Sequence, residues 1–407
     1  MSVPECSLQV VYKIASRCNL DCSYCYVYSK GDESWRRRPA IMSDGVFDAA
    51  VERTRQQCLW SGQTAVSVTF HGGEPTLAGV ARFDRWCKRV YEGLADIVRV
   101  KLCLQTNAIL LDDEWAEVLS RHHVEVGVSM DGTPQIHNRF RVDHRGRGSY
   151  DRVRRGIEAL KTAGIPIEVL AVIPFGADGV EIHRHLIDLG TRSINYLLPD
   201  YTHETIGPIH EQFGETPCSD FLIPIFDHWW FKETIDVRIS LFLTMARVIL
   251  GGASKQDLLG NHPLRFVFVE TDGAIEALDV LRICQPGITG TGLNVLRNDF
   301  RQVADVSPLH RSTIFTGMPL PTKCQSCVER DTCGGGYLPH RYSQRRAFDN
   351  PSVWCADLLR LFGHIRQRLD VDAEETALRR QVLDDLAKSE LPTEASKTTP
   401  RSVFERI

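Results

Sequence analysis

From Val10 to Tyr26 the chain reads VVYKIASRCNLDCSYCY. The run Val10–Ile14 has the β-branched and aromatic composition of a buried strand. Three cysteines follow it with the spacing C-x3-C-x2-C, and we call Cys18, Cys22 and Cys25 the first cysteine group. Functional residues of parallel α/β folds lie at the carboxyl ends of the strands, so this placement predicts a functional loop.

Further strand-like runs alternate with helix-like stretches up to about residue 198. The strand-like runs are Val66–Phe70, Val100–Leu104, Val124–Ser129, Ile167–Val172 and Ile194–Leu198. The helix-like stretches are Ser43–Cys58, Phe83–Leu94, Asp113–Ser120, Tyr150–Ala163 and Val180–Leu189. This alternation predicts parallel pairing through right-handed crossovers. A partial (β/α) barrel and an open doubly wound sheet both fit it.

The pattern changes after residue 198. We expect helices at Phe221–Phe231, Ile239–Leu250 and within Ala356–Leu386, and a hairpin formed by Arg265–Val269 and Ile275–Leu278. The predicted domains are residues 1–235, a barrel, and residues 236–387, a smaller domain with C-terminal helices. The polar tail 388–407 is expected to be flexible, and a role in mimicking a substrate is the less favoured alternative.

Composition excludes several classes of protein. The 407 residues carry a net charge of only −4, so no global electrostatic case for nucleic-acid binding exists. No bilayer-spanning apolar stretch or signal peptide is evident, which predicts a cytoplasmic protein. Thirteen cysteines in a reducing compartment indicate metal binding or catalysis rather than disulfides.

Three thiolates can hold three irons of a [4Fe–4S] cluster and leave the fourth open, whereas a zinc site would need another ligand. The spacing, with Tyr24 before the last cysteine, resembles the radical S-adenosylmethionine (SAM) superfamily. The resemblance implies a partial (β/α)6 TIM-like barrel. It also implies that SAM binds the open iron and is cleaved to a 5′-deoxyadenosyl radical.

Other motifs follow the strands in the family's order. His71-Gly72-Gly73-Glu74-Pro75 resembles the family's GGEP motif, which implies that Gly73, Glu74 and Pro75 contact the methionine amino group. Read alone, the segment fits a tight strand–helix turn equally well.

We also expect cofactor contacts from residues after the third and fourth strands. The resemblance implies that Ser129 and Arg141 hold the SAM carboxylate, for which a guanidinium is well shaped. Read alone, Arg141 is more typical of a surface charge. The same reasoning places Gln105 and Asn107 beside the cofactor.

A second cysteine group, Cys324, Cys327, Cys333 and Cys355, has the spacing C-x2-C-x5-C-x21-C. Zinc and [4Fe–4S] both accept four thiolates. The pattern resembles the SPASM extension of peptide-modifying radical enzymes, which implies an auxiliary [4Fe–4S] cluster.

The chain departs from that extension at two positions. Leu278 and Tyr337 stand where the family places further ligating cysteines, and Cys284 alone could not hold a second cluster. We therefore predict one auxiliary cluster.

Asp279 follows the hairpin position. In sulfatase-maturing relatives a catalytic aspartate stands there, which implies a base at Asp279. A surface aspartate near a turn is the equal alternative.

The segments Cys333–Tyr342 and Asn350–Asp357, with Leu197–Asp200, resemble maturases that form cyclophanes on ribosomally made peptides. This resemblance implies a crosslink from a peptide Cβ to an aromatic ring. It also implies a precursor peptide as partner and flavodoxin or ferredoxin as electron donor. His340 and Arg341 could serve the substrate, although histidine beside a glycine-rich loop is more often structural.

Three other functions stay open: formylglycine formation on a sulfatase, thioether formation or epimerisation of a peptide, and a zinc-stabilised binding module on an inactive barrel. We expect no leader-binding domain before the first strand, and edge-strand pairing is one way to hold a peptide.

Overall fold

The computed structural model describes residues 9–231, 237–254, 256–260 and 262–388. The described residues form two compact units, each assembled from three stretches of the chain. The first unit falls within Met1–Pro174, Ile182–Arg192 and Pro263–Met318, and the second within Phe175–Glu181, Ser193–His262 and Pro319–Ile407. The boundaries at 235 and 387 stay predictions. From residue 389 on, the tail lies outside the described residues.

The first unit is built on a largely parallel sheet. Strands β1 (Gln9–Ala15), β2 (Ala65–Gly72), β3 (Arg99–Thr106), β4 (Glu125–Ser129) and β5 (Ile167–Val172) pair in chain order, all parallel. Strand β8 (Phe266–Val269) pairs parallel with the other edge of β1, and β9 (Ala274–Glu276) and β10 (Gly290–Asn294) continue antiparallel. A doubly wound sheet reverses the order of its first strands, whereas β1 to β5 follow one another in chain order. The order therefore matches a partial TIM-like barrel.

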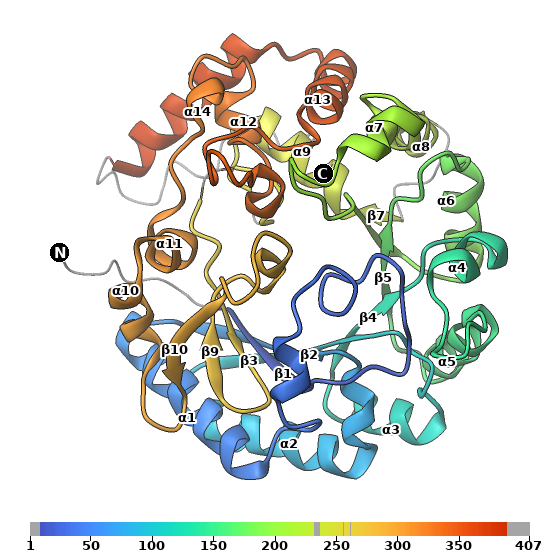
Figure 1. Cartoon of the computed structure of the whole chain (residues 1–407), viewed down its shortest axis with the longest axis vertical. Helices are drawn as coiled ribbons and strands as arrows, with labels where there is room; N and C mark the ends of the chain where they lie inside the picture. The colour runs from blue at the N-terminus through green and yellow to red at the C-terminus, as the bar shows by residue number, and fades with distance from the viewer. Residues whose placement is uncertain (1–8, 232–236, 255, 261, 389–407) are drawn as a thin grey trace. The chain divides into compact units, whose positions relative to one another are not determined.

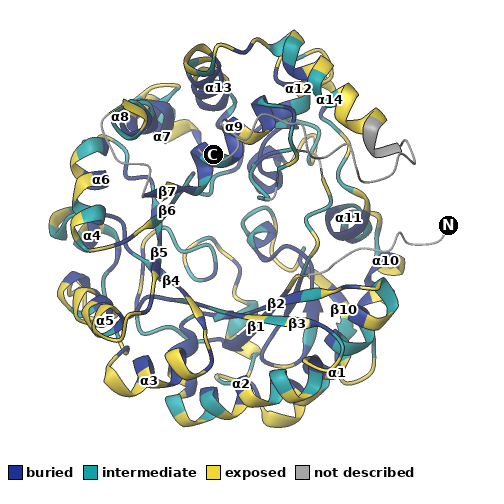
Figure 2. Cartoon of the chain, turned by 180° about the vertical axis from the view of Figure 1, so that it is seen from behind, coloured by how far each residue is buried: buried dark blue, intermediate teal, exposed yellow. Residues whose placement is uncertain are grey.

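Helices cover the outer face of these strands (Figure 1). They are α1 (Asp44–Ser61), α2 (Val80–Leu94), α3 (Asp113–Arg121), α4 (Pro134–Phe140) and α5 (Tyr150–Thr162). Their outward sides are exposed and the strands behind them are buried (Figure 2). Short helices α10 (Val303–Val306) and α11 (Pro308–Arg311) also belong to this unit.

An aromatic stack holds α1 and α2 to the sheet. The ring of Phe47 lies parallel to that of Trp86 at 4.7 Å between centroids, and Phe70 of β2 packs on Phe83 at the same distance. All four rings are buried. As predicted, Ser43 caps α1, because its Oγ accepts the Val46 N–H at 3.3 Å.

The second unit contains a short parallel pair, β6 (Ser193–Leu197) and β7 (Arg238–Ile239), within a largely helical structure. Its helices are α7 (Gly207–Phe213), α8 (Pro217–Phe231), α9 (Ser240–Ile249), α12 (Arg330–Cys333), α13 (Cys355–Leu369) and α14 (Ala373–Lys388). Helix α6 (Gly179–Asp188) is divided between the two units. Among the described residues, no helix combines the length and apolar character needed to cross a bilayer.

The predicted strands and long helices are confirmed to within a few residues. The sequence did not predict α4, α7, β7 or β10, because these elements have seven residues or fewer and carry no clear hydrophobic period.

Candidate functional site

The first cysteine group lies on the loop after β1, as predicted. The Asp21 N–H donates to the Val142 carbonyl at 2.8 Å, and the Ser23 N–H donates to the Phe140 carbonyl at 3.1 Å. These bonds fasten the loop to the end of α4 and to the segment that follows it. The thiols are therefore held on a braced loop at the carboxyl end of a central strand.

Burial dominates the chemistry of these thiols. It raises the pKa of all three, and that of Cys22 rises to about 11. The Leu20 N–H, which donates to Cys18 Sγ at 3.4 Å, lowers the pKa of Cys18, but burial outweighs this effect. Without metal the thiols are thus protonated, and iron would hold them as thiolates because a cation reverses this preference. Three thiols on one short loop, one buried and two half-buried, fit a cluster with an open iron.

Gly73 brings the loop after β2 against the loop after β1. Its N–H donates to the Ala15 carbonyl at 2.8 Å, and a Cβ at Gly73 would stand 2.4 Å from the Arg17 carbonyl oxygen and 1.9 Å from the Tyr28 hydroxyl. The paired glycines thus allow the close approach of the chain's own backbone, which joins the GGEP segment to the cysteine loop.

The Glu74 carboxylate is 1% exposed and binds neighbouring segments together. Its Oε1 accepts from the Thr76 and Thr106 hydroxyls at 2.6 and 2.7 Å, and its Oε2 accepts the Asn107 N–H at 2.8 Å. Burial nevertheless raises its pKa. Each carboxylate oxygen offers about two acceptor sites, so Oε2 keeps capacity for an ammonium group. Pro75 opens the short 3-10 helix that follows.

The residues at the ends of β3 and β4 are brought together as expected. The Gln105 amide donates to Ser129 Oγ at 3.1 Å. The Asn107 amide donates to Asn19 Oδ1 at 2.7 Å and approaches Cys18 Sγ at 3.8 Å. Asn107 therefore links the third strand to the cysteine loop.

Arg141 is not a surface charge. It is 8% exposed, its Nε donates to Asp131 Oδ2 at 2.9 Å, and its guanidinium lies 5.3 Å from the centre of the Tyr24 ring. The Tyr24 hydroxyl donates to the same Asp131 oxygen at 2.5 Å. We did not predict the role of Asp131. The one feature of the sequence that could have indicated this role is the position of Asp131 just after the fourth strand.

Asp279 is buried and held by two groups. The Tyr26 hydroxyl donates to its Oδ2 at 2.6 Å, and the Lys13 ammonium lies 2.8 Å from the same oxygen. Burial alone would raise its pKa, but the charges of Lys13 and Arg282 lower the pKa to about 2. The surface alternative is excluded, since Asp279 is 3% exposed. The carboxylate is ionised and directed to the residue that follows Cys25.

Asp279 belongs to a buried network of three cations and three anions that the sequence did not predict. Lys13 also reaches Glu270 at 3.2 Å, and Arg282 contacts Glu270 and Glu276 at 3.1 and 3.0 Å. The charges balance, which reduces the cost of removing them from water. The members are Lys13, Arg38, Arg282, Glu270, Glu276 and Asp279.

His71 lies at the edge of this network. It stands opposite Lys13 in the parallel register of β1 and β2, so both side chains point to the same face. Its buried Nδ1 has no hydrogen-bond partner among the described residues. Burial lowers its pKa, although the charge of Asp279 opposes the shift. A neutral imidazole therefore neighbours an ionised carboxylate.

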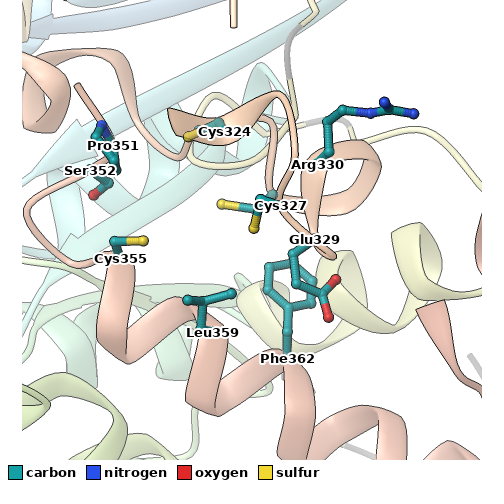
Figure 3. A pocket seen from close by; sticks show the side chains of 11 residues that line it. Cys324, Cys327, Glu329, Arg330, Pro351, Ser352, Cys355, Leu359 and Phe362 are labelled. Carbon is teal, nitrogen blue, oxygen red and sulfur yellow. The ribbon is translucent and has the colours of Figure 1, made fainter. Parts of the chain in front are cut away.

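The second cysteine group lines a pocket in the second unit. Figure 3 shows Cys324, Cys327 and Cys355 around the opening, with Leu359 and Phe362 of α13 beneath it. Among the described residues, no three His, Cys, Asp or Glu side chains converge closely enough for a single metal ion. Thiols that surround an opening suit a cluster better than a zinc ion.

The positions at which the family has further cysteines hold buried side chains that carry no thiol. Leu278 is 3% exposed, at the start of a 3-10 helix in the first unit. Tyr337, in the second unit, packs its ring on that of His340 at 5.0 Å. Cys284 is half-buried and terminates the 3-10 helix. A single auxiliary cluster stays a prediction that these residues support.

Residues 12–189 match the family model described as the Radical SAM superfamily. They form a radical SAM domain, and the chain is an enzyme with radical SAM oxidoreductase chemistry. Such domains bind a [4Fe–4S] cluster and SAM.

The chain resembles sulfatase-maturating enzymes over nearly its whole length. It is 27% identical over 375 residues to the cysteine-type anaerobic sulfatase-maturating enzyme of Clostridium perfringens (strain 13 / Type A), covering 90% of this chain and 98% of that protein. It is 24% identical over 398 residues to the serine-type enzyme of Bacteroides thetaiotaomicron, covering 90% and 91%.

The fold agrees with a solved structure described as native anSMEcpe with bound AdoMet and Kp18Cys peptide. The TM-score is 0.75 with 22% identity, over 89% of this chain and 98% of that one. The barrel with a C-terminal extension is thereby confirmed.

These findings correct one prediction. The cyclophane assignment is wrong, because the full-length relatives are sulfatase-maturating enzymes and match the formylglycine alternative. Two residues of the segments behind that assignment make structural contacts. Trp354 donates its indole N–H to the Pro199 carbonyl at 2.9 Å, and buried His340 lies 3.1 Å from Asp200. These two contacts shape the second unit.

Proposed function

We propose that this enzyme oxidises a cysteine side chain of a sulfatase peptide to formylglycine. The observation that carries the proposal is the buried, ionised carboxylate of Asp279, bound to Tyr26 beside the first cysteine group. The full-length similarity to a cysteine-type sulfatase-maturating enzyme supports it. A peptide is the partner, in keeping with the peptide complex of the structural neighbour.

The first cysteine group would hold the [4Fe–4S] cluster. When bound there with SAM, the cluster supplies a 5′-deoxyadenosyl radical that removes one hydrogen atom from the peptide Cβ. Glu74 would accept from the SAM ammonium through Oε2, and Arg141, aligned by Asp131, would attract the SAM carboxylate. Tyr24 covers the guanidinium and excludes water from it.

Asp279 then accepts the thiol proton. A pKa of about 2 makes it a weak base, but it is ionised at any pH at which the enzyme works. Radical formation at Cβ makes the neighbouring thiol more acidic, so a weak base at hydrogen-bond distance suffices. Lys13 and Tyr26 hold the accepting oxygen in place.

The reaction balances as a two-electron oxidation. The Cβ loses a hydrogen atom to the adenosyl radical, the thiol loses a proton to Asp279, and one electron leaves the substrate. The resulting thioaldehyde adds water and expels hydrogen sulfide to give the aldehyde. An auxiliary cluster at the second cysteine group would supply the one-electron acceptor.

A pair of peptides tests the proposal. The enzyme is reconstituted anaerobically and incubated with SAM, a reductant and a sulfatase active-site peptide that carries cysteine, with serine and alanine versions alongside. We expect an aldehyde, captured by a hydrazide and located by mass spectrometry, with the cysteine peptide. Serine should react more slowly and alanine not at all. Cleavage of SAM without aldehyde from either reactive peptide would refute the proposal.

The cytoplasmic location and the flavodoxin or ferredoxin donor stay predictions. Adding each carrier in place of a chemical reductant in the same assay tests the second.

A further inference from the structure

In the described part of the second unit, one buried guanidinium has no carboxylate partner. Arg341 is 3% exposed. Its Nε donates to the Phe348 carbonyl at 3.2 Å and its Nη2 donates to the Pro319 carbonyl at 2.6 Å. Among the described residues it forms no ion pair with an acidic side chain. Carbonyl dipoles satisfy its hydrogen bonds but do not neutralise its charge.

A buried charge without a counter-charge is costly, so a compensating anion is expected close by. The acidic side chain that interacts with it, Asp349, already accepts from the Thr322 N–H and from Arg346, each at 2.7 Å, and is half exposed. The other ionisable groups within electrostatic reach are Cys324 and Cys333, which would become negative thiolates on binding a metal cluster.

The backbone places Arg341 against the wall of the cysteine pocket. Gly335 lines that pocket, and a Cβ on Gly335 would stand 3.6 Å from Arg341 Nη1. Gly335 has a φ of +88° and a Cβ there would also meet Pro321, so a bare backbone separates the guanidinium from the pocket.

We propose that Arg341 is the counter-charge of an auxiliary [4Fe–4S] cluster in the second cysteine group, and that it raises the reduction potential of that cluster. This inference rests on the proposed function only for the presence of the cluster. Four thiolates make such a cluster anionic, and reduction adds one electron and thus more negative charge. A buried cation beside it stabilises the reduced form, because charges interact strongly where water is excluded. A higher potential suits a cluster that accepts an electron from a substrate radical.

The test measures the auxiliary cluster by itself. The full chain with Cys18, Cys22 and Cys25 changed to alanine keeps only the second cysteine group. It is reconstituted anaerobically and titrated potentiometrically with electron paramagnetic resonance as readout. In this background Arg341→Gln should lower the ratio of reduced to oxidised cluster at a fixed applied potential by at least tenfold. For a one-electron couple, this is a fall of about 59 mV in the reduction potential. Arg341→Lys should recover most of the shift.

Arg330 provides the matched control. It also borders the pocket, but its side chain is half exposed, points away from the opening in Figure 3 and pairs with Asp331 at 3.1 Å. Arg330→Gln should change the potential far less, because water screens its charge.

Each outcome decides the proposal. An unchanged potential in Arg341→Gln overturns it, as does zinc without sulfide in the reconstituted protein. Arg341→Gln could also fail to take up the cluster, and Arg341→Lys then decides. If Arg341→Lys regains both the cluster and its potential, the charge role is supported. If Arg341→Lys also fails, the proposal is overturned. The measurement needs neither SAM nor peptide, so its failure leaves the formylglycine assay unaffected.

Discussion

The hydroxyl of Tyr26 donates a hydrogen bond of 2.6 Å to Oδ2 of Asp279, across 253 positions of the chain. Tyr26 directly follows the last cysteine of the first group, so the bond ties the cofactor loop to the carboxylate that we propose as base. The position of the proposed base is thus fixed by the loop that would hold the radical-generating cluster. Such coupling keeps the two reacting groups at a constant separation.

Changing Asp279 to asparagine should abolish most of the aldehyde formation while SAM is still bound and cleaved. A positioned base contributes roughly 10²- to 10⁴-fold, and we expect a loss in that range. Tyr26→Phe should lose less, because Lys13 still holds the carboxylate. Aldehyde and 5′-deoxyadenosine are quantified in the same reaction. Asp272 is an exposed residue of the hairpin, and the substitution Asp272→Asn is the control. Full aldehyde yield from Asp279→Asn would show that the base lies elsewhere.

Replacing Lys13 should introduce an acidic limb into the pH profile. In the wild type the pKa of about 2 keeps Asp279 ionised, so this group contributes no such limb. Because its pKa is depressed, Asp279 stabilises the folded protein at pH values above the ordinary pKa near 3.9. This stabilisation is lost as the pH falls towards 2. In Lys13→Met, burial raises the pKa, and activity should fall as the pH decreases.

The same variant should lower the free energy of unfolding by about 3–5 kcal/mol, because two buried carboxylates lose a partner. Lys13→Arg should restore both properties in part. Lys101→Met removes an exposed lysine of the same sheet and should leave the profile unchanged. Identical pH profiles for Lys13→Met and the wild type would contradict the electrostatic account.

Gly73→Ala should disrupt SAM binding. The new methyl group would stand 2.4 Å from the Arg17 carbonyl oxygen, so the two loops must separate. We expect at least a tenfold weaker affinity for SAM, measured by equilibrium binding to the reconstituted enzyme. Gly45→Ala meets no atom within 4 Å and lies in α1, so it should be neutral or stabilising by up to about 1 kcal/mol. Equal affinities in the two variants would exclude the packing role of Gly73.

Iron analysis tests the number of clusters. We expect about eight iron and eight sulfide per chain, as two [4Fe–4S] clusters require. Alanine at the three positions of the first cysteine group should halve both values, and alanine at the four positions of the second group should do the same. A content near twelve would indicate a second auxiliary cluster despite Leu278 and Tyr337.

Most of the predictions rested on the spacing of residues that are close together in the sequence. The first cysteine group, Glu74 and the strand ends were found because one short segment, or the end of one strand, defines each of them. Arg141 was harder, since its partner Asp131 is apparent only once α4 has folded back on the loop. Asp279 depended on a hairpin alignment.

The charge network could not be predicted. Lys13 sits within an apolar strand, where a single lysine has no periodic signal, and its partners lie more than 250 residues away. Such pairings form only when the strands assemble into the sheet, so no short segment of the sequence reveals them.

The pairing of β1 with β8 also has a consequence for biosynthesis. Val10 to Tyr12 lie beside Val267 to Val269, so one edge of β1 gains its partner only after the chain has passed residue 266. Until then the Lys13 ammonium lacks Glu270 and Asp279, and burying it unpaired is unfavourable. A nascent or truncated chain therefore keeps β1 hydrated and its edge open, which exposes it to proteases and to pairing with other chains. The charges of the buried network thus also delay completion of the sheet until the chain that supplies β8 has been made.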